Sequence, residues 1–188
     1  MYLKEKKNRK VKGRGCSDGW SQRLYTNKIK TSSPTAALTA IMLTCMIDVF
    51  EKRDVATVAI PGVFLQTKMP QEEKDVHVIL DGRMAELLAK IAPETYQEYV
   101  SQKRGKAYIY CRVIIAVHGT LKAALLFWKK LSTSLKMRGF EINIYMTGAS
   151  PIINGSQCTI VWHVDDLKIS HKDSTVIDEI IASLKSEY

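Results

Sequence analysis

The sequence predicts a mixed α+β fold with a largely antiparallel sheet. Helical and strand-like apolar patterns follow one another in the order helix, strand, strand, helix, strand, helix, hairpin, helix. Two strand patterns near the C-terminus are separated by only two residues, which is typical of a hairpin. Of the 188 residues, 46% are hydrophobic and 25% are charged, so a packed core is expected. The pattern is also compatible with a ferredoxin-like split unit.

The N-terminal segment is polar, basic and interrupted by glycines. We expect residues 1–32 to form a weakly ordered basic arm, with short strand pairing around residues 23–25. Residues 33–188 form the folded core in this prediction. Ser33 can cap a helix that has Pro34 at its first position and continues to about Glu51. The apolar face of this helix is expected in the core; it comprises Leu38, Ile41, Met42, Cys45, Met46 and Val49.

The middle of the chain predicts strands and one interrupted helix. Valine-rich residues 54–60 indicate a buried strand that ends in a turn, and alternating residues 75–80 indicate a second strand. Residues 84–100 are helical in composition, with an interruption at Pro93. Residues 107–115 are typical of a third strand.

The C-terminal third predicts two helices and a hairpin. A helix follows Gly119 and ends at Gly139, and a turn at Asn154-Gly155 precedes strands at 158–164 and 167–170. The last helix begins near Asp173 or Ser174 and buries a second apolar stripe. The two stripes are Leu121, Ala124, Leu125, Trp128, Leu131 and Leu135, and then Val176, Ile177, Ile180, Ile181 and Leu184.

Positive charge is concentrated at the N-terminus. Residues 1–30 hold ten basic and two acidic side chains, a net charge of +8, whereas the whole chain carries +9. A basic arm on a nearly neutral body is typical of polyanion binding, with nucleic acid as the leading candidate. A disordered, solubilising tail is the alternative that charge leaves open. The residues expected to contact nucleic acid are Lys10, Lys12, Arg14 and Arg23.

Two adjacent aspartates, Asp165 and Asp166, lie at the tip of the predicted hairpin. A tight turn can bring adjacent carboxylates toward one site, and hard cations take oxygen ligands. Apolar residues flank the pair on both sides, so a packed support presents it. An ordinary surface turn is the competing interpretation, since aspartates are common in turns.

The segment 163–167, His-Val-Asp-Asp-Leu, resembles the Val-Asp-Asp-Leu motif of copia-type retrotransposon reverse transcriptases. Four further segments resemble that family in the same order, and the resemblance covers nearly the whole chain. They are 12–16 (Lys-Gly-Arg-Gly-Cys), 33–35 (Ser-Pro-Thr), 58–66 (Val-Ala-Ile-Pro-Gly-Val-Phe-Leu-Gln), and 116–122 (Ala-Val-His-Gly-Thr-Leu-Lys) with Trp128.

The resemblance implies the fingers and palm of a reverse transcriptase, with a ferredoxin-like palm packed on helices and no thumb or RNase H domain. It implies two-metal phosphoryl transfer, with two Mg²⁺ (or Mn²⁺) ions about 3.5–4 Å apart at a primer 3′-hydroxyl. The implied partners are an RNA template, a DNA primer and deoxynucleoside triphosphates. The chain would be part of a longer polyprotein.

Five residues match functional positions of that family. Asp165 and Asp166 match two of its three catalytic, metal-binding carboxylates. Phe64 matches the bulky residue that screens out a ribose 2′-hydroxyl. Gln66 and Lys122 lie in the matching motifs and are expected to contact the substrate.

The third carboxylate of the family should stand at position 59, which is Ala59 in this chain. Asp54 is no substitute, because it lies at the opposite end of the predicted strand. Loss of even an outer partner of a metal costs about 10–100-fold in affinity or activity. We therefore predict little or no polymerase activity. His118 in place of a tyrosine and Met146 in place of an aspartate agree with a decayed copy.

The remaining residues indicate no other chemistry. The four cysteines lack metal-ligand spacing, as expected of a reduced intracellular protein in the cytoplasm or nucleus. We expect no membrane association, since no secretory signal is visible and the longest apolar run, 36–47, is too short to span a bilayer. His77 and His163 are interpreted as sheet residues, and Trp20 as a candidate for base stacking.

Two other classes of function stay open. A non-catalytic nucleic-acid-binding module would use the basic arm and a ferredoxin-like sheet. A translated fragment with no selected role would also explain the degenerate motifs.

Overall fold

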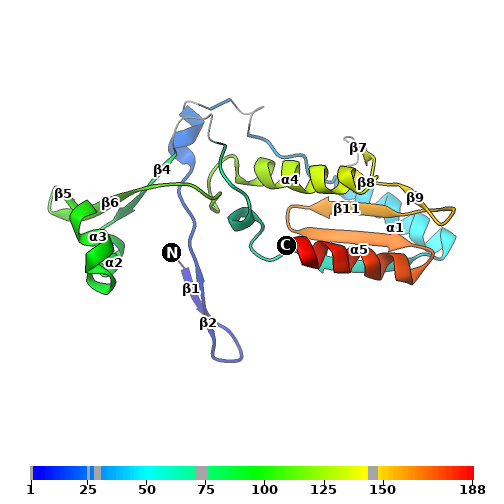
Figure 1. Ribbon diagram of the computed structural model, residues 1–188, viewed down its shortest axis with the longest axis horizontal. Coiled ribbons are helices and arrows are strands. Elements are labelled where there is room, and N and C mark those ends of the chain that lie inside the picture. Colours follow the sequence, from blue (N-terminus) through cyan, green and yellow to red (C-terminus); the bar gives the residue numbers. More distant parts are fainter. Residues whose placement is uncertain (1, 25, 28–30, 71–75, 144–147) are drawn as a thin grey trace.

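The computed structural model describes residues 2–24, 26–27, 31–70, 76–143 and 148–188 (Figure 1). It confirms a mixed α+β fold, and every pair of strands among these residues is antiparallel. The molecule is elongated, with a larger sheet at one end and a smaller sheet at the other. Within these ranges, no helix combines the length and the hydrophobicity that crossing a membrane requires.

The larger sheet has the strand order β3-β12-β11-β8-β7. Helices α4 and α5 pack on one face of it, where Leu131, Leu135 and Ile177 join Ile160 and Ile169 in the main core. The order of β3, α4, β11, β12 and α5 is that of a split β-α-β-β-α unit. The bounds are β3 (Asp54–Ala59), β7 (Ile142–Asn143), β8 (Gly148–Ala149), β11 (Thr159–His163), β12 (Asp166–His171), α1 (Leu38–Glu51), α4 (Ala123–Met137) and α5 (Ser174–Glu187).

Helix α1 lies on the opposite face of this sheet. Neighbouring residues of a strand face opposite sides, and Leu167 and Ile169 of β12 belong to the core under α4 and α5. Lys168 between them therefore faces the other side. There its ammonium group donates to Thr44 of α1 at 3.1 Å and forms an ion pair with Asp48 of the same helix.

Local signals place the ends of the two core helices where the sequence predicts them. Asp173 caps α5, because its carboxylate accepts a hydrogen bond from the Thr175 N–H at 3.0 Å. Gly139 follows α4 with φ 84°, and the Phe140 N–H donates to the Leu135 carbonyl at 3.1 Å. The stripe of α5 is confirmed in the core. Of the predicted α4 stripe, Leu131 and Leu135 belong to the core and Trp128 packs against it, whereas Leu121, Ala124 and Leu125 are only half-buried. The fully buried Phe127 was not predicted.

A short hairpin, β9 (Ile152–Ile153) and β10 (Ser156–Gln157), precedes β11. Its turn confirms the Asn154-Gly155 prediction, with φ 50° and 74°. The buried His171 ring at the end of β12 lies within hydrogen-bonding distance of the hairpin carbonyls of Ile153 and Ser156, so the last strand ties the hairpin to the sheet.

The smaller sheet, of order β4-β6-β5, has its own small core around Ala85, Ala107 and Ile109. The predicted helix at 84–100 is interrupted at Pro93 as expected, and Pro93 is the first residue of a new short helix. Residue 75 of the predicted second strand lies outside the described residues. The bounds are β4 (His77–Asp81), α2 (Arg83–Ile91), α3 (Pro93–Tyr96), η4 (Gln97–Tyr99), β5 (Ser101–Lys103) and β6 (Lys106–Arg112).

The N-terminal arm is more ordered than the sequence indicates. Strands β1 (Tyr2–Glu5) and β2 (Val11–Arg14) form a two-stranded ribbon that projects from the body (Figure 1). The strand pairing predicted around residues 23–25 is wrong for Arg23, which lies in the 3₁₀ helix η1 (Trp20–Leu24). Tyr25 lies outside the described residues. The sequence of β1 and β2 is rich in lysine and lacks the alternating apolar residues that predict a strand. A ribbon that projects into solvent does not require such an apolar face.

The segment after this ribbon docks against the loop before α4. The Ser17 N–H donates to the His118 carbonyl at 2.8 Å, and Gln22 accepts from the Leu121 N–H at 2.9 Å. Gly19 and Gly119 allow this approach, since a Cβ at Gly119 would lie 1.9 Å from the Ser17 carbonyl oxygen.

Two predictions for the first helix are wrong. Helix α1 begins at Leu38, and the Ser33 hydroxyl donates to the Pro34 carbonyl at 3.4 Å instead of capping the helix. Most of its apolar stripe is not core, because Met46 and Val49 are 70% and 80% exposed. The face that packs on the sheet carries the small or polar residues Ala40, Thr44 and Asp48.

Candidate functional site

The hairpin turn consists of Val164 and Asp165, one residue earlier than predicted, and Asp166 is the first residue of β12. His163 pairs with Asp166, so Val164 and Asp165 are the only residues between β11 and β12. Val164 has φ 58°, in the left-handed region that a β-branched residue rarely adopts. Strain of this kind persists only where the surroundings impose it, and it clusters at functional sites. Both aspartates are exposed on a buried support that includes Trp162, which is 2% exposed.

Position 59 lies directly beside this turn. In the antiparallel pair of β3 and β12, Ala59 is the partner of Asp166, and the Ile60 N–H donates to the Asp165 carbonyl at 2.9 Å. Side chains directly opposite each other project to the same face, with their Cβ atoms about 4.5–5.5 Å apart. Asp54 pairs with His171 at the far end of the same strands, so it is no substitute for a carboxylate at position 59.

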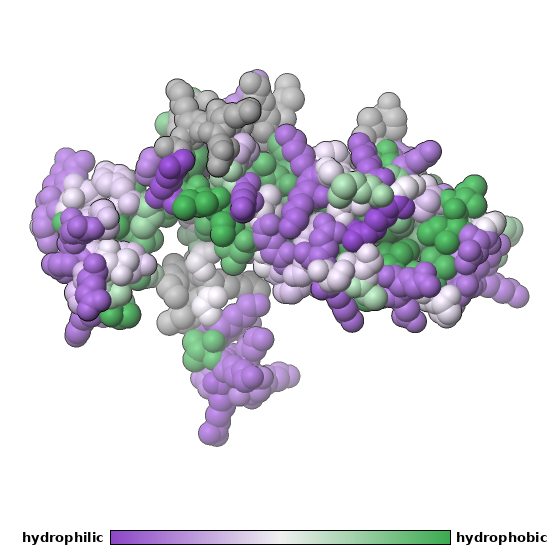
Figure 2. Space-filling model, viewed as in Figure 1, coloured by the Kyte–Doolittle hydropathy of each residue, from purple (hydrophilic) through white to green (hydrophobic). Residues whose placement is uncertain are grey.

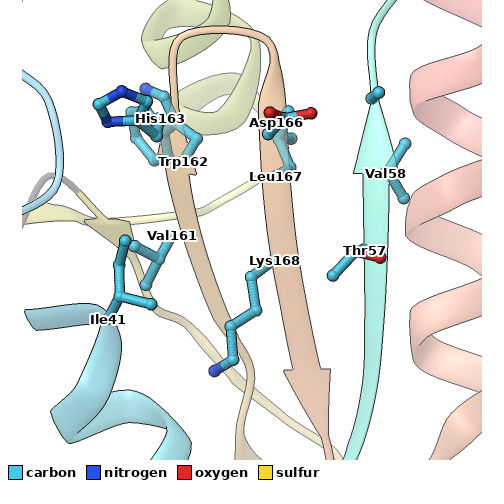
Figure 3. A pocket seen from close by; sticks show the side chains of 10 residues that line it. Ile41, Thr57, Val58, Val161, Trp162, His163, Asp166, Leu167 and Lys168 are labelled. Atoms are coloured by element: carbon cyan, nitrogen blue, oxygen red, sulfur yellow. The ribbon is translucent and has the colours of Figure 1, made fainter. Parts of the chain in front are cut away.

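A pocket of about 360 Å³ opens between α1 and this face of the sheet (Figure 3). Figure 3 shows Asp166 at one end of β12 and the Lys168 side chain reaching toward α1. The pocket residues are Ile41, Thr57, Val58, Ala59, Val161, Trp162, His163, Asp166, Leu167 and Lys168.

Lys168, which lines this pocket, forms an ion pair with α1. Lys168 and Asp48 form a mostly buried ion pair, with 14% and 5% of their side chains exposed. The second carboxylate oxygen of Asp48 is buried without a hydrogen-bond partner. Sequence reasoning missed this pair, although a lysine amid the apolar residues of β12 was a detectable signal, since buried charges need partners.

Phe64 lies outside the lining of this pocket. It belongs to η3 (Val63–Gln66), one turn beyond β3, and is half-buried against the core. Its ring meets the ring of His118 edge to face, with centroids 4.6 Å apart. Phe64 and His118, which are two of the positions that the resemblance singles out, are therefore in contact.

Gln66 and Lys122 also lie outside the pocket lining. The side-chain amide of Gln66 donates to the carbonyls of Pro61 and Tyr188, at 2.9 Å and 3.1 Å. Both amide hydrogens of Gln66 are thus engaged, and they link the turn after β3 to the residue that follows α5. Lys122 is half-buried and directly precedes α4.

The predicted nucleic-acid contacts divide between two elements. Lys10 and Lys12 are exposed in the projecting ribbon, which Figure 2 shows as a hydrophilic extension. Arg14 ends β2, and its side chain lies outside what the structure describes. Arg23 is exposed in η1 beside Trp20, whose side chain is 64% exposed.

The two histidines predicted as sheet residues lie in strands. His77 begins β4 and His163 ends β11, both as exposed sheet residues. Trp162 is buried in the core and Trp128 packs against it. Met146, the position where an aspartate is expected, lies outside the described residues.

Within the ranges described above, no three His, Cys, Asp or Glu side chains gather as a metal site. The available oxygen ligands at the hairpin are the carboxylates of Asp165 and Asp166, with Ala59 contributing none. Two exposed carboxylates without a third suit weak binding of a hard cation. Comparison with protein-family models, with curated proteins and with solved structures finds no match to this chain.

Proposed function

We propose that this chain is the fingers–palm core of a copia-type retrotransposon reverse transcriptase, disabled by the alanine at position 59. One observation carries the proposal. The family pattern requires a third carboxylate at position 59, and the register of β3 and β12 places Ala59 opposite Asp166. The segments around positions 59 and 166 are about a hundred residues apart in the sequence, and the resemblance of their motifs did not require them to lie side by side.

The ligand set accounts for the expected loss of activity. Asp165 and Asp166 would hold Mg²⁺ or Mn²⁺, which would supply Lewis-acid stabilisation of charge in nucleotidyl transfer. An aspartate at position 59 would reach the same face as Asp166, whereas the methyl group of alanine presents no oxygen. The expected substrates are an RNA template, a DNA primer and deoxynucleoside triphosphates.

Primer extension on an RNA template tests this proposal. We expect the native chain to extend a DNA primer poorly or not at all in Mg²⁺ or Mn²⁺, and the variant Ala59→Asp to gain synthesis. Ala59→Asn is the matched control, because it has the size of aspartate without the charge. Synthesis by the native chain at the level of Ala59→Asp would contradict the inactivity, and a gain that survives Asp166→Ala would contradict the site.

A non-catalytic nucleic-acid-binding module is the second candidate. The observation in its favour is the ribbon, where Lys4, Lys6, Lys7, Arg9, Lys10 and Lys12 are all exposed. Such a module predicts RNA binding that weakens steeply with salt and is indifferent to Asp165→Ala. Charge reversal of Lys10 and Lys12 to glutamate would reduce this binding, while the same change at Lys136 and Lys185, in the last turns of α4 and α5, would leave it nearly unchanged.

A further inference from the structure

Helix α1 has its polar face turned toward the protein and its apolar face turned toward solvent. Ala40, Thr44 and Asp48 are the buried residues of the helix. The exposed residues between positions 38 and 50 are uncharged, and Thr39 is the one polar side chain among them. They are Leu38, Thr39, Met42, Leu43, Cys45, Met46, Val49 and Phe50. We call these eight residues the outer face of α1.

Both acidic groups of α1 bind partners of their own chain. Asp48 pairs with Lys168 on the sheet, and Glu51 pairs with Arg53 at 3.0 Å. The Arg53 guanidinium holds the pKa of Glu51 below its ordinary value. The outer face is therefore free of charge on a chain that carries +9 overall.

The apolar side chains of the outer face are large and open to solvent. Six of them are between 48% and 89% exposed, with Phe50 the most exposed. A stable dimer buries about 800 Å² on each partner, and a Phe side chain alone can bury about 150–250 Å².

The chemistry of the face disfavours two other kinds of occupant. Binding to nucleic acid depends mainly on lysine and arginine contacts with phosphates, and the exposed residues of the outer face include neither, although Phe50 could stack on a base. A helix that lies on a membrane carries lysine and arginine on its polar face. The polar face of α1 instead carries Asp48 and is covered by the sheet.

We propose that the outer face of α1 is a self-association surface, on which two copies of this chain pack α1 against α1 about a two-fold axis. A two-fold interface uses the same patch on both copies, so an uncharged patch meets no like charge across the axis. Exposed Cys45 lies close to the middle of the outer face in sequence. A helix pair that crosses at its midpoint places Cys45 near Cys45 of the second copy.

Sedimentation velocity of the full chain tests this inference. Nuclease treatment and high salt remove any association that is mediated by bound nucleic acid, because salt weakens protein–nucleic acid binding. Association through an apolar surface persists under these conditions. We expect a concentration-dependent dimer of twice 21.2 kDa. Met46→Lys should raise the dimer dissociation constant by about 100-fold or more, because burial of two like charges costs several kcal/mol.

Ile91→Lys in α2 is the matched control, because Ile91 is 77% exposed on a helix outside the outer face. Circular dichroism and urea unfolding should show that both lysine variants keep the native fold. In a Cys16→Ser background, a mild oxidant should link two copies through Cys45, and additional Cys45→Ser should abolish the product. A monomer at all concentrations, or a dimer that Met46→Lys leaves intact, would overturn the proposal.

Discussion

Ala59 and Asp166 face each other across the antiparallel pair of β3 and β12. The Ile60 N–H donates to the Asp165 carbonyl and fixes the end of β3 against the hairpin turn. A single methyl group therefore stands where a carboxylate would share one face with Asp166.

An aspartate at position 59 should make stability depend on divalent cations. Ala59→Asp places a like charge directly opposite Asp166, which costs roughly 0.2–1 kcal/mol without a metal. Mg²⁺ that binds only the folded state reverses this loss by mass action. We expect Ala59→Asp to melt below the native chain in EDTA and to gain more than the native chain from Mg²⁺. Ala59→Asn should show no such gain.

Removal of Lys168 should be strongly destabilising. Asp48 is 4% exposed, and loss of its partner leaves a buried, uncompensated charge. Lys168→Met should lower the free energy of unfolding by about 3–5 kcal/mol, as measured by urea denaturation. The double variant Asp48→Leu, Lys168→Met should recover most of this loss. Equal stability of the single and double variants would contradict the pairing.

Gly119 should tolerate no side chain. Its φ is 92°, and a Cβ would lie 1.9 Å from the Ser17 carbonyl oxygen, so alanine must displace the segment before η1. We expect Gly119→Ala to expose residues 15–24 to limited proteolysis and to lower stability by about 1–3 kcal/mol. Gly155→Ala, where φ is also positive but nothing lies within 4 Å, separates backbone strain from the clash.

Cys158 should react with thiol reagents only after unfolding. Burial raises the pKa of this thiol to about 11, whereas Cys16 and Cys45 are exposed. A raised pKa in the folded state contributes stability that is present below the ordinary value of 9 and is lost as pH rises toward 11. Urea unfolding between pH 8 and pH 11 should therefore show a smaller loss of stability for Cys158→Ala than for the native chain. Rapid labelling of Cys158 in the folded chain would contradict this description.

The sequence was sufficient where local rules and packing agree. The hairpin and α5 follow from alternation, a two-residue turn and the Asp173 cap, although the turn is Val164-Asp165 and Asp166 belongs to β12. Helix α1 shows the limit, because periodicity identifies an apolar face without showing which face meets the sheet. Lys168 and Asp48 decide that orientation, and they are 120 residues apart in the chain. The β1–β2 ribbon was not predicted, because strand prediction relies on an apolar face that is buried. Lys4 and Lys12 pair in this ribbon without such a face.

Titration with Mn²⁺, followed by electron paramagnetic resonance, tests the central claim most directly. It measures the ligand set itself and requires neither primer nor template. We predict that Ala59→Asp binds Mn²⁺ at least about tenfold more tightly than the native chain, and that Asp166→Ala in the same variant removes the gain. Equal affinity of Ala59→Asp and the native chain, or a gain retained without Asp166, would contradict a shared metal site at the end of β3 and the hairpin.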